Sequence, residues 1–201
     1  QYLAQIARNH QDAQGALANA LGAEQRAQQA PHVTPGFAAS LAGDIGYAWF
    51  LNGNMDEAEH HFARAVAMLC AAGRGESPTA VAIRSNWALA CGGVGDVRRA
   101  LTLFDEVLVI VTRRTPGGTP PPYLVNNRAS TLVMLGRYDE AAAECERLRR
   151  IAENAGAAVF ALNARVLQAR IRMERGDLDG AAGELADLDA AAAALPEDSF
   201  A

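Results

Sequence analysis

Apolar residues along the chain recur every three or four positions, in segments that lie on either side of short glycine turns. The segment before Gly53 carries Phe37, Leu41, Ile45 and Trp49 at this spacing. The segment after it carries Ala58, Phe62, Ala65, Val66 and Leu69. Since this spacing places the side chains on one face of a helix, each segment is predicted to be an amphipathic helix with a buried apolar side.

This pair of segments repeats along the sequence. Turn glycines occur at Gly53, Gly95, Gly136 and Gly176, at separations of 42, 41 and 40 positions. An alanine follows each of them by five positions, at Ala58, Ala100, Ala141 and Ala181. One period before Ala58 lies Ala16, so the N-terminus is interpreted as a degenerate further copy. A glycine can adopt the positive φ that ends the first helix, and the next residue, such as Asn54, can cap the second.

Three segments open with a capping residue followed by proline, at Thr34-Pro35, Ser77-Pro78 and Thr119-Pro120. Proline suits the first helical position, because its missing N–H would have no partner there. We therefore predict first helices near 35–52, 78–94, 120–135 and 157–175, and second helices near 55–72, 97–114, 138–155 and 178–194. The loose stretch 114–122 leaves the repeat in register, so 1–201 is predicted to be a single array. Its parts are a partial repeat at 1–33 and full repeats at 34–76, 77–118, 119–156 and 157–196.

Composition favours a helical, cytoplasmic protein. Half of the 201 residues are hydrophobic but only 6% are aromatic, which favours close-packed helices over sheets. The mean hydropathy is −0.03, and no apolar run approaches the ~18 residues of a membrane-spanning helix. The net charge of −5 argues against a nucleic-acid surface. All 18 basic residues are Arg, which indicates a GC-rich bacterial gene, and a chain that begins at Gln is expected to be a segment of a longer protein.

The sequence predicts no enzyme activity, no cofactor and no metal. His60 and His61 adjoin Glu57 but have no third ligand at metal-binding spacing, so they are assigned to a solvated helix face. The carboxylates are likewise assigned to exposed surface at Asp139, Glu140, Glu144 and Glu146. Small buried thiols are the interpretation for Cys70, Cys91 and Cys145. The glycine-rich stretches lack the lysine and strand of a phosphate loop, and there is no nucleophile elbow.

The motif of each copy resembles the tetratricopeptide repeat (TPR). In the first full copy it comprises Ile45-Gly46, Trp49, Gly53, Met55, Ala58, Phe62 and Ala65. Later copies keep the small residue, the turn glycine and the alanine, at Ala88, Gly95 and Ala100, at Ala129, Gly136 and Ala141, and at Ala169, Gly176 and Ala181. The resemblance implies an all-α fold, a right-handed α-α superhelix of antiparallel helix pairs. The usual period is about 34 residues, and the longer period here is similar to that of kinesin light chains and bacterial regulators.

The resemblance also implies a concave groove lined by the first helix of each pair. The sixth residue of the motif, which points into the groove in this family, falls on Asp44, Asn86, Asn127 and Leu167. Neighbouring groove positions fall on Ser40, Gly43, Tyr47, Ser85, Leu89, Tyr123, Asn126, Ser130, Asn163 and Arg170. An asparagine amide can bond the backbone of an extended peptide with both a donor and an acceptor. Asn86 and Asn127 either bind a peptide in this way or only solvate a polar inner surface.

Two functions therefore remain open. The first is a non-catalytic scaffold that binds a protein or peptide in the groove, as the interaction or sensor segment of a larger bacterial regulatory protein. The alternative is an architectural module for self-association, or for packing against another domain of its own chain, which an exposed apolar patch at one end would favour. Neither involves nucleic acid or a membrane. Binding of chaperone C-termini through a lysine clamp is disfavoured, because the chain has no lysine.

Overall fold

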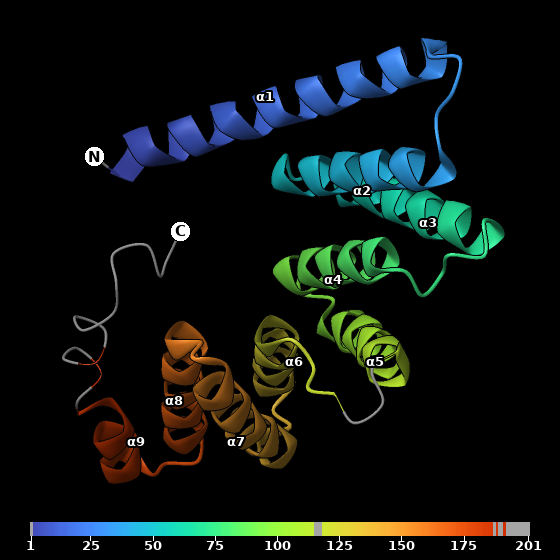
Figure 1. Ribbon diagram of the computed structural model, residues 1–201. Coiled ribbons are helices and arrows are strands. Elements are labelled where there is room, and N and C mark those ends of the chain that lie inside the picture. The colour runs from blue at the N-terminus through green and yellow to red at the C-terminus, as the bar shows by residue number, and fades with distance from the viewer. Residues whose placement is uncertain (1, 115–117, 187, 189–190, 192–201) are drawn as a thin grey trace. The chain divides into compact units, whose positions relative to one another are not determined.

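All regular secondary structure is α-helical in the part of the chain that the structure, a computed structural model, describes: residues 2–114, 118–186, 188 and 191, with side chains from residue 12 onward (Figure 1). Nine helices lie in this part: α1 (Tyr2–Gln29), α2 (Pro35–Leu51), α3 (Met55–Ala71), α4 (Pro78–Gly93), α5 (Val97–Arg114), α6 (Pro122–Met134), α7 (Tyr138–Ala155), α8 (Ala158–Glu174) and α9 (Leu178–Leu185). The predicted all-α fold class is confirmed. Helices α2 to α9 each begin within two residues of the predicted start.

The chain divides into two compact units, Gln1–Leu103 (unit 1) and Phe104–Ala201 (unit 2), with the boundary inside α5. In unit 1, α1 packs on α2, α2 on α3 and α3 on α4, and α2 also contacts α4. Unit 2 repeats this order, because α6, α7, α8 and α9 pack in sequence and α6 also contacts α8. In each unit the earlier first helix, α2 or α6, therefore contacts its own partner helix and the next first helix, α4 or α8. The single array over 1–201, with its repeat limits, stays a prediction.

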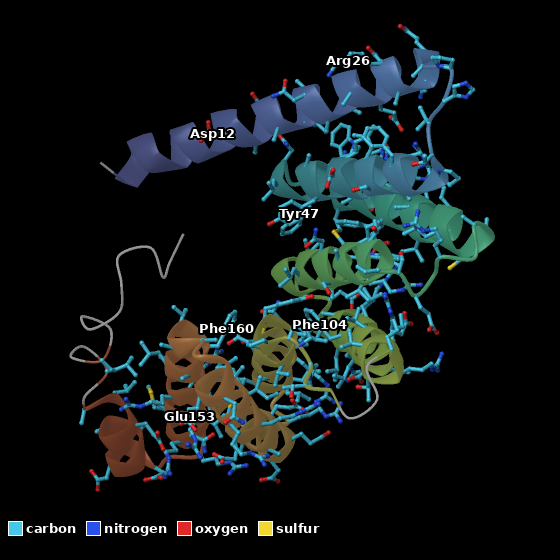
Figure 2. The ribbon with its side chains drawn as sticks, in the orientation of Figure 1. Asp12, Arg26, Tyr47, Phe104, Glu153 and Phe160 are labelled. Carbon is cyan, nitrogen blue, oxygen red and sulfur yellow. The ribbon has the colours of Figure 1, made fainter. Side chains whose placement is uncertain are left out.

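Small residues lie where paired helices meet. A Cβ added to Gly46 on α2 would lie 3.1 Å from the Ala58 carbonyl oxygen of α3 and equally close to the Phe62 ring. The alanines of the repeat motif are all buried, at Ala58, Ala88, Ala100, Ala129, Ala141, Ala169 and Ala181. Larger side chains fill the layers beside them: Phe62 stacks on Trp87 at 6.1 Å between ring centroids. In unit 2, Phe160, labelled in Figure 2, packs against the buried cluster that contains Val125 and Leu148.

The four turn glycines adopt the positive φ that the sequence predicts, between 70° and 90°. At the first turn, the Gly53 N–H donates to the Phe50 carbonyl at 2.9 Å, and the Asn54 N–H donates to the Trp49 carbonyl at 3.0 Å. The same two bonds recur at the other three turns, which is the Schellman arrangement. The residue after the glycine then caps the next helix through its side chain at Asn54, Asp96 and Asp177, but not at Arg137.

Two of the three proline starts are confirmed and one is wrong. The Thr34 and Ser77 hydroxyls accept from the Phe37 and Ala80 N–H groups, both at 3.2 Å, and a proline follows each. Helix α6 instead begins at Pro122, and its N-cap is Pro121 rather than Thr119. A residue before proline is kept out of the helical region. Pro120 and Pro121 each precede a proline, so the helix cannot start before Pro122.

Both ends of the chain differ from the simplest expectation. The degenerate N-terminal copy is one continuous helix, α1, that passes through Gln11-Asp12 without a turn, because glutamine stands where the other copies have the turn glycine. The first turn of α2 leaves Phe37 with 57% of its surface exposed, although the apolar pattern places it on the buried side. The last predicted helix, 178–194, is described as α9 to Leu185. Most of its remainder lies outside the described residues.

Replacing Gly95 with alanine is expected to lower the free energy of unfolding by about 1–2 kcal/mol, because an L side chain is strained at its φ of 90°. Gly92, three residues earlier on α4, is the matched control. An alanine Cβ there would lie 3.8 Å from the Ala100 Cβ, an ordinary contact, and the change is expected to be neutral or slightly stabilising. Urea unfolding of the two variants checks this, and equal effects would show that the turn does not require glycine.

The corrected start of α6 gives a second test. Ser77→Ala removes the hydroxyl that accepts from the Ala80 N–H, and is expected to lower the free energy of unfolding by about 1 kcal/mol. Thr119→Ala is expected to change it by less than about 0.5 kcal/mol, because Thr119 is exposed and caps no helix. Thermal melts compare the two. An equal loss in Thr119→Ala would place the start of α6 back at Thr119.

Candidate functional site

Most of the predicted groove positions fall on one exposed face of each first helix, whereas Gly43 and Ser85 are buried. The positions on this face lie 13, 9 and 6 residues before the turn glycine. Residues separated by three or four positions lie on the same side of a helix. In unit 1 these positions are Ser40, Asp44 and Tyr47 on α2, and Ala82, Asn86 and Leu89 on α4. In unit 2 they are Tyr123, Asn127 and Ser130 on α6, and Asn163, Leu167 and Arg170 on α8. All twelve are exposed or half-buried, and we call them the inner face of each unit.

In unit 1 the inner face is formed where α2 and α4 approach closely. A Cβ on Gly43 of α2 would lie only 2.8 Å from the Ile83 side chain of α4, so glycine is needed for this approach. Tyr47 extends from α2 on the side of α4 (Figure 2), with its ring 5.9 Å from that of Phe50. The Asn86 amide is half-buried at the corresponding position of α4. The two helices therefore present a carboxylate, a phenol and an amide together.

Ser85 does not belong to this surface. It is 5% exposed, and its hydroxyl donates to the Val81 carbonyl of its own helix at 2.9 Å. Ser85 lies ten residues before the turn glycine, whereas the nearest inner-face position lies nine residues before it. The side chain of Ser85 is therefore rotated away from the inner face and is buried. A small buried serine satisfies its hydroxyl on the backbone in this way. The sequence-based assignment of Ser85 to the groove is therefore not supported by its position.

In unit 2 the inner face carries neighbouring amides. The Asn126 side-chain N–H donates to the Asn127 side-chain oxygen at 3.2 Å, and both residues are half-buried. Asn163 is half-buried on α8, while Tyr123 and Arg170 are exposed. The bond from Asn126 occupies one lone pair of the Asn127 oxygen and leaves its N–H groups to donate. The prediction that Asn86 and Asn127 serve one peptide joins residues of different units and stays a prediction.

The charges of the inner faces are few. Asp44 makes no hydrogen bond or ion pair with the described residues, and burial by its surroundings raises the pKa of its carboxyl above the usual 3.8. Arg170 is also without a partner among the described residues. These two are the charged members of the twelve positions. Each unit therefore presents one charge to a ligand, negative in unit 1 and positive in unit 2.

The titratable residues outside the inner faces correct three expectations. His61 is 8% exposed rather than solvated, and its Nδ1 has no partner. Glu144 is also largely buried, because Arg128 holds it at 2.9 Å while bonding Asp105 at 2.7 Å. Cys91 and Cys145 are buried as expected, with pKa values raised by desolvation to about 11 and about 12, whereas Cys70 is exposed. High thiol pKa values leave the buried cysteines unreactive.

Two hollows in the described part of the chain were not predicted from the sequence. One, of about 250 Å³, lies between α7, α8 and α9, and its polar lining includes Arg149, Arg165 and Arg172. All three arginines are already bonded within unit 2. The other, of about 560 Å³, lies at the end of unit 1, where exposed Phe37 faces the alanines Ala23, Ala27 and Ala30. The short side chains of α1 cannot cover the Phe37 ring, and the apolar period alone cannot reveal this.

Neither a metal cluster nor a membrane-spanning helix is found in the described part of the chain. No three His, Cys, Asp or Glu side chains among the described residues are placed to hold one metal ion. Within the same residues, none of the helices combines the length and the apolar character needed to span a bilayer.

The buried His61 is expected to make stability depend on pH. Desolvation lowers its pKa below 6.5, and Arg64 and His60 act in the same direction, while Glu24 and Glu57 oppose them. The unfolded chain then binds the proton more tightly, so the free energy of unfolding falls as pH is lowered from 7 to 5. His61→Gln is expected to reduce this fall. His60→Gln, at the exposed neighbouring position, is the control and is expected to keep it. Urea unfolding at pH 5, 6 and 7 measures both.

Solved structures share this arrangement of helices. BtubC (BKLC) from P. vanneervenii superposes with a TM-score of 0.78 at 21% identity, over 96% of this chain and 78% of that one. A kinesin light chain of nearly identical TPR-like repeats from Podospora anserina gives a TM-score of 0.69 at 20% identity, over 94% and 95% of the two chains. A point variant of that kinesin light chain gives 0.70 at 20% identity, over 96% and 97%. The sequence matches no family model and no curated protein. The chain therefore has the fold of kinesin-light-chain-like TPR-like repeats.

Proposed function

We propose that the chain is a non-catalytic scaffold that binds a protein segment in extended form along its inner faces. The observation that carries this is that each first helix exposes or half-buries the side chains at three equivalent positions of the repeat, most of them polar, with Asn86 and Asn127 at the same place in the repeat. TPR-like repeats generally use such extended concave surfaces for protein binding. The chain would act as the interaction or sensor segment of a larger bacterial regulatory protein in the cytoplasm.

The chemistry of these positions suits a peptide backbone. An asparagine amide both donates and accepts, so it can replace the partner that a peptide group has in a sheet, whatever the peptide side chain. Tyr47 and Tyr123 lie one turn away from Asp44 and Asn127 on the same helix faces and offer aromatic surface to side chains. Backbone bonds would supply affinity and the tyrosines selectivity. Nothing in this arrangement activates a nucleophile or binds a cofactor.

The acidic balance of the chain supports a protein partner over a nucleic acid. A nucleic-acid surface needs clustered basic side chains that release counterions from phosphates. Here the net charge is −5, and many arginines are paired with carboxylates, including Arg64, Arg99, Arg128, Arg149 and Arg172. Such pairs leave little free positive charge.

One observation favours the architectural alternative. The apolar hollow around Phe37 lies at the first turn of α2, beside the C-terminal end of α1. An apolar surface at the end of a repeat stack is where a second copy or another domain would continue the packing. In this alternative the inner faces are only solvated, and association depends on Phe37.

The experiment that decides between these is selection of random dodecapeptides, displayed on phage, on the purified chain. Peptides that bind are titrated by fluorescence polarisation against the wild type and the double variant Asn86→Ala, Asn127→Ala. Loss of a backbone hydrogen bond typically costs about 1–3 kcal/mol, so the double variant is expected to bind at least tenfold more weakly. Its melting temperature should stay nearly unchanged, since neither amide lies in the apolar core.

Asn154→Ala is the matched control, because Asn154 is an exposed asparagine on α7, a second helix. It is expected to bind like the wild type. Equal affinities in all three proteins would move binding away from the inner faces. Concentration-dependent sedimentation that disappears in Phe37→Ala would instead support the architectural alternative.

A further inference from the structure

The inner face of unit 1 carries a single carboxylate, Asp44, that no other group among the described residues neutralises. Asp44 projects from the middle of α2, and it is exposed, so a ligand can reach it. Neither its own helix nor α4 places a cation at the inner-face positions, where Ser40 and Tyr47 share its face of α2 and Asn86 stands at the equivalent position of α4. A surface carboxylate can be stabilised by an arginine or by a helix N-terminus of the same protein. Here it has neither among the described residues.

Three arginines of unit 1 are bonded to other groups of the unit. Arg64 pairs with Glu24, which joins α3 to α1. Arg99 pairs with Glu59 at 2.8 Å and covers the Trp87 ring at 4.9 Å from its centroid. Arg84 donates to the Gly75 carbonyl at 3.0 Å, in the loop between α3 and α4. Each of these three arginines joins helices or loops of unit 1, and no cation contributes to the electrostatics of Asp44.

The surroundings of Asp44 penalise its charge. Desolvation is the cause that raises the pKa of its carboxyl, with no opposing contribution from a nearby cation. A group with a raised acid pKa weakens the folded state above that pKa, because the unfolded chain gives up the proton more readily. The raised pKa of Asp44 indicates a carboxylate that is partly desolvated and that no cation of the described residues offsets.

An aromatic ring lies beside this carboxylate. Tyr47 is three residues further along α2 and on the same face, so the two side chains are neighbours on the helix surface. A carboxylate next to a tyrosine matches an amine or guanidinium on a flexible aliphatic stem. The charged end can pair with the carboxylate while the stem or the cation lies against the ring.

We propose that the inner face of unit 1 selects a peptide with a lysine or arginine side chain, whose cation pairs with Asp44 and whose stem lies on Tyr47. This rests on the proposed function, because it assumes that a peptide lies along the inner face. It adds the chemistry of the bound segment: a basic residue at the position next to the backbone that Asn86 bonds. Where Asn86 supplies affinity without regard to sequence, Asp44 supplies selectivity.

The test is a double-mutant cycle with the selected dodecapeptides as probes. A peptide that contains lysine or arginine is compared with its analogue in which norleucine or citrulline replaces that residue. Against the wild type, the basic peptide is expected to bind about tenfold more tightly than the analogue, the size of a charged hydrogen bond in a partly desolvated site. Against Asp44→Asn, the two peptides are expected to bind equally.

Asp56→Asn is the matched control. Asp56 is an exposed aspartate in the first turn of α3, so its change alters the net charge equally but leaves the inner face intact. It is expected to keep the tenfold preference. Asp44→Asn should fold normally, with a melting temperature at pH 7 no lower than that of the wild type, since it removes a desolvated charge.

The outcomes separate this inference from the proposed function. Selected peptides without basic residues, or a preference that survives Asp44→Asn, would overturn the role of Asp44 while binding through Asn86 still stood. Loss of the preference in both Asp44→Asn and Asp56→Asn would reduce it to a general effect of charge, and would also overturn it. If no peptide binds, or if binding ignores the double asparagine variant, the proposed function itself fails.

Discussion

Chain reversal at glycine is the constraint on which the remaining structure depends. Each turn glycine takes a φ that is strained for other residues, and this lets the N–H groups of two successive residues bond carbonyls near the end of the preceding helix. The reversal therefore happens within three or four residues and sends the second helix back along the first. Because the turn is so short, the two helices must touch near it. The motif therefore places small residues, such as Gly46 and Ala58, where the two helices touch.

The same constraint explains how much could be predicted from the sequence. Turn glycines and helix caps are local, so helix starts at Pro35, Pro78, Val97 and Tyr138 follow from the residues alone. Burial is not local. His61 and Ser85 are polar and belong by composition to a surface, yet neighbouring helices cover one and the packing of α4 encloses the other. Phe37 belongs by periodicity to the core, but the apolar side chains that α1 places beside it are the short ones of Ala23 and Ala27. In each case, whether the side chain is buried depends on the residues packed around it, which periodicity and composition do not reveal.

The candidate site shows the same division. Which residues lie on the inner face follows from counting back from the turn glycine, and most of the predicted positions are indeed exposed or half-buried. The isolation of Asp44 could not be read from the sequence, because it depends on where the arginines of unit 1 go. Three of them fasten helices or loops together and are unavailable to the inner face. The ion pairs that hold the helix pairs therefore also set the charge that a ligand meets.

The cluster of Arg128, Asp105 and Glu144 in unit 2 fixes the rotational position of α6. Arg128 bonds Asp105 through Nε and Glu144 through Nη1, so one planar guanidinium is fixed by acceptors on two other helices. A helix held in this way cannot rotate about its own axis without breaking one of the two bonds. Asn127 is the adjacent residue of α6, and its amide is aimed about 100° around the axis from Arg128. The cluster therefore fixes the rotation of α6 about its axis, and with it the direction in which the side chain of the neighbouring Asn127 points.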